Sequence, residues 1–243
     1  MRILLIGEYS NVHATLAEGL RALGQQVTVV SNGDFWKDYP RDIDLSRRPG
    51  KWGGLAYLAK TMATLHKLRG YDVVQLINPM FLELKAERIA PIYKYLRKHN
   101  KKVFLGAFGM DYYWVHENIT RMRLRYSVFN VGNRLRNDEP AMRERRDWIG
   151  TAKESLNKMI AEDCDGIIAG LYEYWACYGP LFPHKTTFIP FPIKPKTQPM
   201  AYQEGNAPHP LRLFIGISKG RSAYKGTDIM LEAAQAIKTK YPH

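Results

Sequence analysis

The feature that most constrains the fold of this 243-residue chain is a regular alternation of short apolar segments with amphipathic ones. Strand-like patterns cover residues 2–6, 26–31, 71–77 and 101–109, and helical patterns cover 12–23, 54–69 and 81–100. Strands that alternate with helices form parallel sheets, because each helix returns the chain to the edge where the next strand begins. The alternation therefore predicts an α/β fold, a doubly wound parallel sheet with helices on both faces.

The alternation lapses over residues 111–150 and then resumes. A helix at 151–163, a strand at 165–170, a short helix at 171–178 and a strand at 185–193 follow. Six of the 14 prolines lie between Pro190 and Pro210, where they remove backbone donors and favour an extended linker. The organisation predicted is a first domain at 1–189, a linker at 190–210, and a single β-loop-α unit at 211–243 that opens a second domain.

The charge balance points to an anionic partner. The chain has 36 Lys and Arg against 23 Asp and Glu, which leaves a net charge of +13. Eight arginines fall between Arg121 and Arg146, interleaved with apolar and aromatic residues. Such a run suits an anionic membrane surface or a nucleic-acid groove, although a charge run is more commonly a solvated face.

Other compositional features favour a cytoplasmic protein. No apolar run approaches the ~18 residues of a membrane-spanning helix. The two cysteines, Cys164 and Cys177, are too few for a disulfide scaffold and lack metal-ligand spacing, so free thiols are expected. Peripheral association with the inner face of the cell membrane is compatible with the basic charge.

The loop "GISKGRSAYKGTD" near the end of the chain is rich in cations and glycine. Gly216 is followed by Lys219, Arg221 and Lys225, and a helix is expected from about Thr227. The lysine precedes the glycine, which excludes an ordinary Walker A loop, and the first strand lacks the dinucleotide fingerprint. Cations beside a helix N-terminus suit a diphosphate. The alternative is a solvated basic turn that merely starts the helix.

Several segments together resemble glycosyltransferase family 4 enzymes of the GT-B fold. "MRILLIGEYSNVHATLAEGLRALGQQVTVVS" is similar to the family's first strand, glycine loop, helix and second strand. "CDGIIAG" and "FIPFPI" resemble the end of its N-terminal domain, and the basic loop with its "KG" resembles the start of its C-terminal domain. The likeness spans nearly all 243 residues.

The resemblance implies a hexosyltransferase-type enzyme that transfers a sugar from a nucleotide diphosphate sugar to a saccharide or lipid-linked acceptor. It implies no cofactor and no metal. Arg221 and Lys225 map onto the family's diphosphate-binding residues, although the spacing from Gly216 departs from the usual pattern and Lys219 is placed to share the role. The first domain is then the acceptor side. The 211–243 unit is only the start of the nucleotide-sugar domain, so this chain alone is expected to be inactive, with its catalytic residues unassigned.

Four residues are predicted to face the acceptor side of a cleft, because they follow strands one and four: Gly7, Asn11, His13 and Asp111. Each has a simpler interpretation. Gly7 suits a turn, Asn11 and Asp111 suit helix caps, and a histidine in a first helical turn is usually exposed. Tyr112, Tyr113 and Trp114 suit either a sugar-stacking wall or the core.

Two other functional classes remain open. One is a non-catalytic nucleotide- or sugar-binding module, which would keep the α/β fold without transfer. The other is a nucleic-acid-binding protein, which rests only on the charge and the arginine run. It is the least favoured, so no nucleic-acid partner is expected.

Overall fold

The computed structural model describes residues 1–195, 214–217 and 226–241 of the chain. Seven strands form one sheet in which every neighbouring pair is parallel, in the order β3-β2-β1-β4-β5-β8-β9. Their bounds are β1 Arg2–Ile6, β2 Gln26–Ser31, β3 Ile43–Asp44, β4 Val73–Leu76, β5 Lys102–Ala107, β8 Gly166–Ala169 and β9 Thr186–Phe188. The predicted α/β fold with a Rossmann-like parallel sheet is confirmed.

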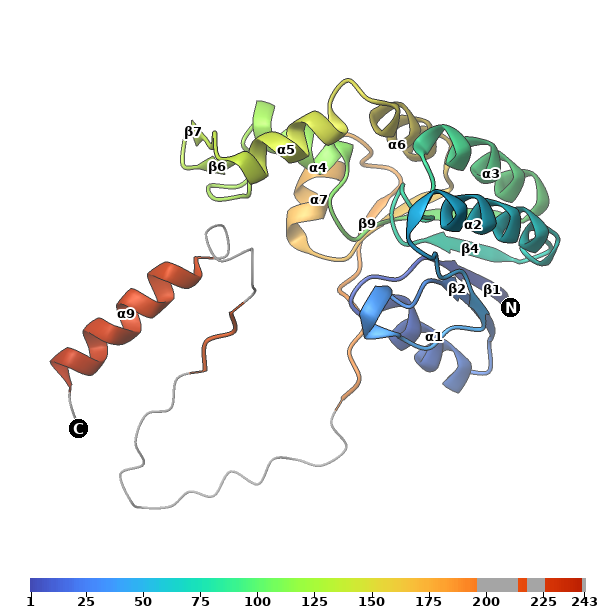
Figure 1. Cartoon of the computed structure of the whole chain (residues 1–243), viewed down its shortest axis with the longest axis horizontal. Helices are drawn as coiled ribbons and strands as arrows, with labels where there is room; N and C mark the ends of the chain where they lie inside the picture. Colours follow the sequence, from blue (N-terminus) through green and yellow to red (C-terminus); the bar gives the residue numbers. More distant parts are fainter. Residues whose placement is uncertain (196–213, 218–225, 242–243) are drawn as a thin grey trace, which may run out of the picture. The chain divides into compact units, whose positions relative to one another are not determined.

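Helices cover both faces of the sheet (Figure 1). The helices within residues 1–195 are α1 Val12–Ala22, α2 Gly50–Thr64, α3 Ala86–His99, α4 Tyr112–Thr120, α5 Glu139–Trp148, α6 Ala152–Asp163 and α7 Tyr172–Tyr178, with short 3₁₀ turns η1 Phe35–Lys37 and η2 Leu65–Lys67. Of these, α5 lies beyond the sheet (Figure 1). Successive residues of β1 point to opposite faces, as the pleat of a strand requires. Leu4 packs into the larger core, whereas Ile3 packs with Ala17 of α1 in a smaller one.

The strand order reverses between β1 and β4. The helix after β1 lies on one side of the sheet and the helix after β4 lies on the other (Figure 1). The loops that leave the carboxyl ends of these two strands therefore diverge, and such a switch point is where doubly wound folds bind ligands.

Several predicted boundaries were wrong. The third helix begins at Ala86 rather than at residue 81, because Phe81 and Leu82 are buried in a loop that packs on the core. The second helix begins at Gly50, four residues earlier than predicted. The short strand β3 was not predicted at all.

The 111–150 segment is an ordered excursion from the alternation. It contains α4, α5 and a two-stranded antiparallel ribbon of β6 Asn130–Val131 and β7 Arg134–Leu135. Trp114 and Phe129 are buried within it and lie 5.4 Å apart, centroid to centroid. Both side chains belong to the larger core, so the excursion packs on the same core as the sheet.

The chain divides into two compact units, Met1–Lys194 and Pro195–His243. In the second unit the described residues include α9 Thr227–Lys240, which follows Gly226 with its φ of +66°. A strand was predicted to reach Gly216, but residues 214–217 adopt no regular secondary structure. The helix exposes Ile229 and Ile237.

Candidate functional site

The loop after β1 has an unusual backbone that brings it against β4. Gly7 has a φ of +87°, and a Cβ atom there would lie 2.2 Å from Ile77 Cγ2. Ser10 and Asn11 also adopt left-handed conformations, with φ of 52° and 68°. Only glycine tolerates both the geometry and the close approach at position 7. Asn11 stands at the helix start but its side chain caps nothing, so the helix-cap interpretation of Asn11 was wrong.

The cap of α1 is Glu8. Its carboxylate accepts hydrogen bonds from the backbone N–H of His13 at 3.3 Å and of Ala14 at 2.8 Å, and its side chain is buried. Burial raises the pKa of Glu8, while these backbone donors lower it. A helix N-terminus attracts phosphate through its free N–H groups. Here an internal carboxylate takes them, so a phosphate would lose its donors and meet negative charge.

His13 is buried, which overturns the predicted surface position. Its Nδ1 lies 2.8 Å from the carbonyl oxygen of Gly7, which can only accept, so Nδ1 carries the proton. Nε2 then accepts from the side-chain amide of Gln75 at 3.2 Å. Burial lowers the pKa of His13 to about 4. The neutral ring of His13, at the start of α1, therefore links the loop after β1 to β4 through hydrogen bonds.

A cavity of about 130 Å³ lies at the carboxyl ends of β1, β2 and β4. It has room for about four water molecules or part of one sugar ring. Its lining mixes carboxylate, amide and aromatic groups with apolar ones: Gly7, Glu8, Tyr9, Ser31, Asn32, Phe35, Leu45, Tyr57, Ile77, Met80, Phe81, Leu82 and Glu83. Gly7 is the only one of the four predicted cleft residues in this lining.

The polar groups of the cavity are held by one another. The side-chain amide of Asn32 donates to the carboxylate of Glu83, and the backbone N–H of Glu83 donates to the Tyr57 hydroxyl oxygen at 3.1 Å. Burial raises the pKa of Tyr9 to about 12, so its hydroxyl keeps its proton. Phe35 lines the cavity and is 64% exposed. Fixed hydrogen-bonding groups beside an open aromatic ring suit a hydroxyl-rich ligand.

A larger open groove of about 670 Å³ adjoins this cavity through Met80 and Glu83. Its lining contains charged residues of both signs: the basic Arg47, Lys85, Arg146 and Lys153, and the acidic Glu83, Glu87 and Asp147. Two of its cations are already neutralised, because Lys153 pairs with Asp147 at 2.5 Å and Arg146 pairs with Glu139 at 2.5 Å. The groove is mixed in charge and also contains apolar residues such as Met80 and Leu84, and it extends the cavity toward α3 and α6.

Asp111 is a buried structural carboxylate. It accepts from the Trp114 backbone N–H at 2.8 Å, which caps α4, and from the Tyr178 hydroxyl at 2.8 Å. Asn157 donates to the same hydroxyl at 3.0 Å. Burial raises the pKa of Asp111 to about 7. It follows β5 as predicted but lines neither the cavity nor the groove, and the helix-cap interpretation is confirmed. Tyr113 is buried beside it, as the core interpretation requires.

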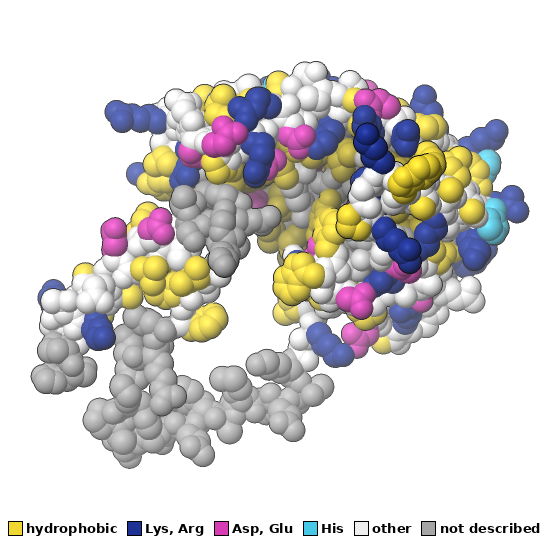
Figure 2. Space-filling model, viewed as in Figure 1, with side chains coloured by type: hydrophobic (Ala, Val, Ile, Leu, Met, Phe, Trp, Pro, Cys, Tyr) yellow, Lys and Arg dark blue, Asp and Glu magenta, His cyan; other side chains and the backbone are white. Residues whose placement is uncertain are grey.

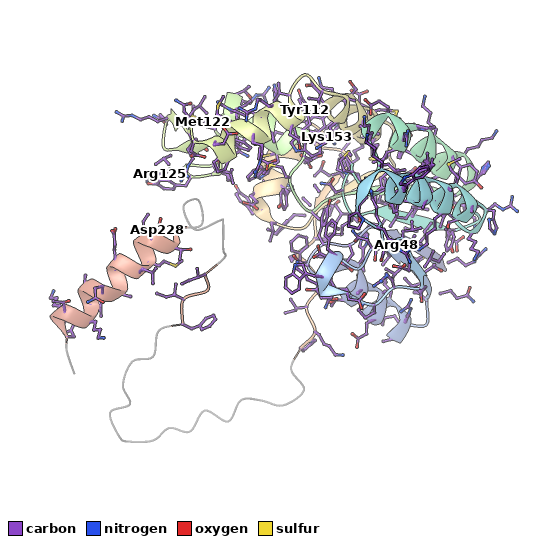
Figure 3. All side chains as sticks on the ribbon, in the orientation of Figure 1. Arg48, Tyr112, Met122, Arg125, Lys153 and Asp228 are labelled. Atoms are coloured by element: carbon purple, nitrogen blue, oxygen red, sulfur yellow. The ribbon has the colours of Figure 1, made fainter. Side chains whose placement is uncertain are left out.

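Many of the eight arginines of the excursion pair with carboxylates. Glu117 is buried and lies 2.9 Å from Arg123 Nε and 3.5 Å from Arg121. Arg136 and Arg143 also lie near acids, Asp138 at 3.8 Å and Glu144 at 3.6 Å. Arg125, labelled in Figure 3, stacks on Tyr126 at 5.5 Å from the ring centroid.

Comparison of the chain with protein-family models, with curated proteins and with solved structures finds no match. The site must therefore be interpreted from its own chemistry. Within residues 1–195, 214–217 and 226–241, no group of three or more His, Cys, Asp and Glu side chains could hold a metal ion. In the same ranges no helix is long and apolar enough to cross a membrane.

The predicted donor-side residues are only partly described. Gly216 is exposed, and Gly226 precedes α9 in a left-handed conformation. Lys219, Arg221 and Lys225 lie outside the described residues, so their predicted role stays a prediction. The N-cap residue of α9 is Gly226, which has no side chain to cap the first amides of the helix.

Five residues of the cavity lining are functional candidates that the sequence analysis did not predict: Glu8, Asn32, Phe35, Tyr57 and Glu83. One signal could have identified two of them, because Glu8 and Asn32 lie within two residues of the ends of apolar strands, at the edge where ligands bind. Nothing local marks Glu83 or Tyr57. Their place in the lining depends on how three separate loops meet.

Proposed function

We propose that the chain is a glycosyltransferase of the GT-B type whose first unit binds the acceptor through the cavity and groove at the carboxyl edge of the sheet. The observation that carries the proposal is the cavity lined by Glu8, Asn32, Glu83 and Phe35 at the switch point between β1 and β4. Carboxylate and amide groups bind sugar hydroxyls, and an aromatic ring packs on the apolar face of a sugar.

The cap of α1 supports a neutral acceptor at this edge rather than a nucleotide. A diphosphate needs free backbone donors and positive charge, and Glu8 supplies the opposite. The basic loop with Lys219, Arg221 and Lys225 is the part of the sequence suited to the diphosphate of a nucleotide sugar. The donor would thus bind at the basic loop before α9, and the acceptor would bind in the cavity beside the capped N-terminus of α1.

The chemistry then follows from charge. When the bond between the sugar and the diphosphate breaks, negative charge builds on the departing phosphate, and fixed cations stabilise it without reorganisation. Arg221 and Lys225 would supply those cations. On the acceptor side, Glu83 and Asn32 would orient a hydroxyl so that it meets the sugar carbon in a productive geometry.

Saturation-transfer NMR with a panel of neutral saccharides tests the acceptor half. At least one saccharide is expected to bind the wild-type chain, and Asn32→Ala and Phe35→Ala should remove most of the signal. Asn133→Ala, at an exposed site in the excursion, is the matched control. Absence of saccharide binding, or equal binding by Asn32→Ala, would reject the acceptor site.

Calorimetric titration with inorganic pyrophosphate tests the donor half, because the basic loop is the part expected to hold a diphosphate. Pyrophosphate is expected to bind, and Arg221→Ala with Lys225→Ala should weaken binding by about 2 kcal/mol or more for each lost phosphate contact. Unchanged binding by the double variant would remove the donor assignment and leave a saccharide-binding module as the alternative.

A further inference from the structure

Helix α2 is apolar on the face that it turns to solvent. Its inward residues Tyr57 and Thr61 are buried, as in any helix that packs on a sheet. On the outward face, however, Trp52 is 84% exposed, Leu55 58% and Met62 53%. An outward face is normally polar. This one exposes apolar side chains along most of the helix.

The exposed residues form a stripe with lysine at its margins. At 3.6 residues per turn, Trp52, Leu55 and Ala59 lie within one narrow sector of the helix surface, and Ala56 and Ala63 lie beside them. Lys51 and Lys60 fall on opposite sides of that sector. Figure 2 shows hydrophobic and Lys/Arg side chains side by side over this part of the surface. Long lysine side chains at such margins can extend their charge to a polar boundary while their stems stay apolar.

The segment around the stripe contains no acidic residue. Residues 45–71 include six Lys and Arg and neither Asp nor Glu. Lys60 pairs with Asp44 at 3.1 Å, outside the segment. Within the part of the chain that the structure describes, no ion pair engages the other five cations: Arg47, Arg48, Lys51, Lys67 and Arg69. Arg48 lies near the beginning of α2 (Figure 3).

We propose that this outward face of α2, flanked by the unpaired cations, binds the surface of an anionic lipid bilayer. An apolar stripe with Trp and Leu at its centre and cations at its edges is the pattern of a helix that lies in the interfacial plane. A second copy of the chain would bring the same excess of positive charge to the contact. A nucleic acid would leave the apolar stripe uncovered.

The arginine-rich excursion fits this role less well, because many of its arginines already pair with Glu117, Asp138, Glu139 and Glu144. The α2 segment also contributes Leu45 and Tyr57 to the cavity lining. Binding through α2 would hold the cavity close to the bilayer surface. The inference goes beyond the proposed function and does not depend on it, since a saccharide-binding module could bind lipid in the same way.

Vesicle flotation of the whole chain tests the proposal. Vesicles of phosphatidylcholine alone are compared with vesicles that also contain phosphatidylglycerol, at low and at high salt. Two α2 variants are used, Trp52→Ser with Leu55→Ser, and the triple Arg48→Gln, Lys51→Gln, Lys67→Gln. The matched control is Arg121→Gln, Arg123→Gln, Arg125→Gln in the excursion, and the thermal midpoint of each variant verifies that it is folded.

The wild-type chain is expected to float with the anionic vesicles only and to be released by salt. Each α2 variant should lower the partition coefficient about tenfold or more, while the excursion variant keeps it within about threefold. Failure to float, equal binding to neutral vesicles, or α2 variants that bind like wild type would overturn the proposal. Loss of binding in the excursion variant alone would also overturn it. So would a chain that binds no vesicle but forms a dimer, if Trp52→Ser with Leu55→Ser dissociates that dimer.

Discussion

Two carboxylates at the same edge of the sheet both cap a helix, but one is enclosed in the core and the other borders a cavity. Glu8 follows β1 and Asp111 follows β5, and each caps the helix that comes next. Asp111 is sealed by Tyr178 and Asn157 beneath the aromatic helices α4 and α7. Glu8 borders an open cavity, because α1 turns away from the helix after β4. What packs above a strand end, rather than the residue itself, decides whether that end belongs to the core or to a site.

The largest expected effect concerns the buried carboxylate. The pKa of Asp111 is raised from 3.8 to about 7 by burial. The folded protein keeps this proton up to about pH 7, and the unfolded chain loses it near pH 4. Below pH 4 this protonated carboxyl therefore adds up to about 4 kcal/mol to the free energy of unfolding, and this contribution is lost as the pH rises through 7.

Asp111→Asn removes that titration. Relative to wild type, the variant's free energy of unfolding should rise by up to about 4 kcal/mol between pH 4 and pH 8. His13, whose pKa is lowered, titrates in both proteins and cancels in the difference. Urea denaturation across this range measures the effect, and parallel pH profiles for the two proteins would show that Asp111 is not held in a desolvated core.

The next largest effect concerns the loop that shapes the cavity. Gly7→Ala must place a Cβ atom 2.2 Å from Ile77 Cγ2 at a φ of +87°. Strain and overpacking together should lower the free energy of unfolding by about 3 kcal/mol. Gly19→Ala in α1, where a Cβ meets nothing within 4 Å, is the control and should be neutral or stabilising. Equal stability of the two variants would contradict the described loop geometry.

A smaller effect is expected at the cap that borders the cavity. Glu8→Ala leaves one buried and one partly buried amide of α1 without their acceptor, which should lower the free energy of unfolding by about 2 kcal/mol. Glu18→Ala, at an exposed position of the same helix, should change it by less than about 0.5 kcal/mol. Thermal melting of both variants tests the cap. A neutral Glu8→Ala would mean that the N-terminus of α1 is free to bind anions after all.

The smallest effect separates paired from unpaired arginines in the excursion. Arg123→Gln removes the nearest partner of the buried Glu117 and should lower the free energy of unfolding by about 1 kcal/mol, because Arg121 remains nearby. Arg134→Gln, at an exposed position, should be neutral. The same loss in both would mean that the pairing contributes nothing specific.

The sheet could be predicted from the sequence because each strand carries its own apolar run and each helix its own period. Val27, Val29 and Val30 identify β2 without knowledge of its neighbours. Short β3 has no such run, and it forms only because Ile43 pairs with Val30. The hydrophobic periodicity of the sequence therefore predicts helices and strands that bury an apolar face. It does not predict a short strand such as β3, which forms only by pairing with a neighbouring strand.

The candidate site was largely beyond prediction for a similar reason. The position of Gly7 follows from its strand, but the burial of His13 depends on Gln75 of β4 and on Phe108, which directly follows β5. The cavity likewise needs Asn32 and Glu83, 51 residues apart, to meet. Contacts between loops that are far apart in the sequence cannot be predicted from a local sequence pattern.

The most direct test of the central claim is an amide NMR titration of the isotope-labelled chain with a neutral saccharide that it binds and, separately, with inorganic pyrophosphate. The account predicts that the saccharide shifts the amides of Gly7, Asn32 and Glu83. Pyrophosphate should leave them unmoved and shift amides of residues 216–226, which include the basic loop. Pyrophosphate that shifts Gly7 and Asn32, or a bound saccharide that leaves all three unmoved, would contradict the separation of acceptor and donor sites.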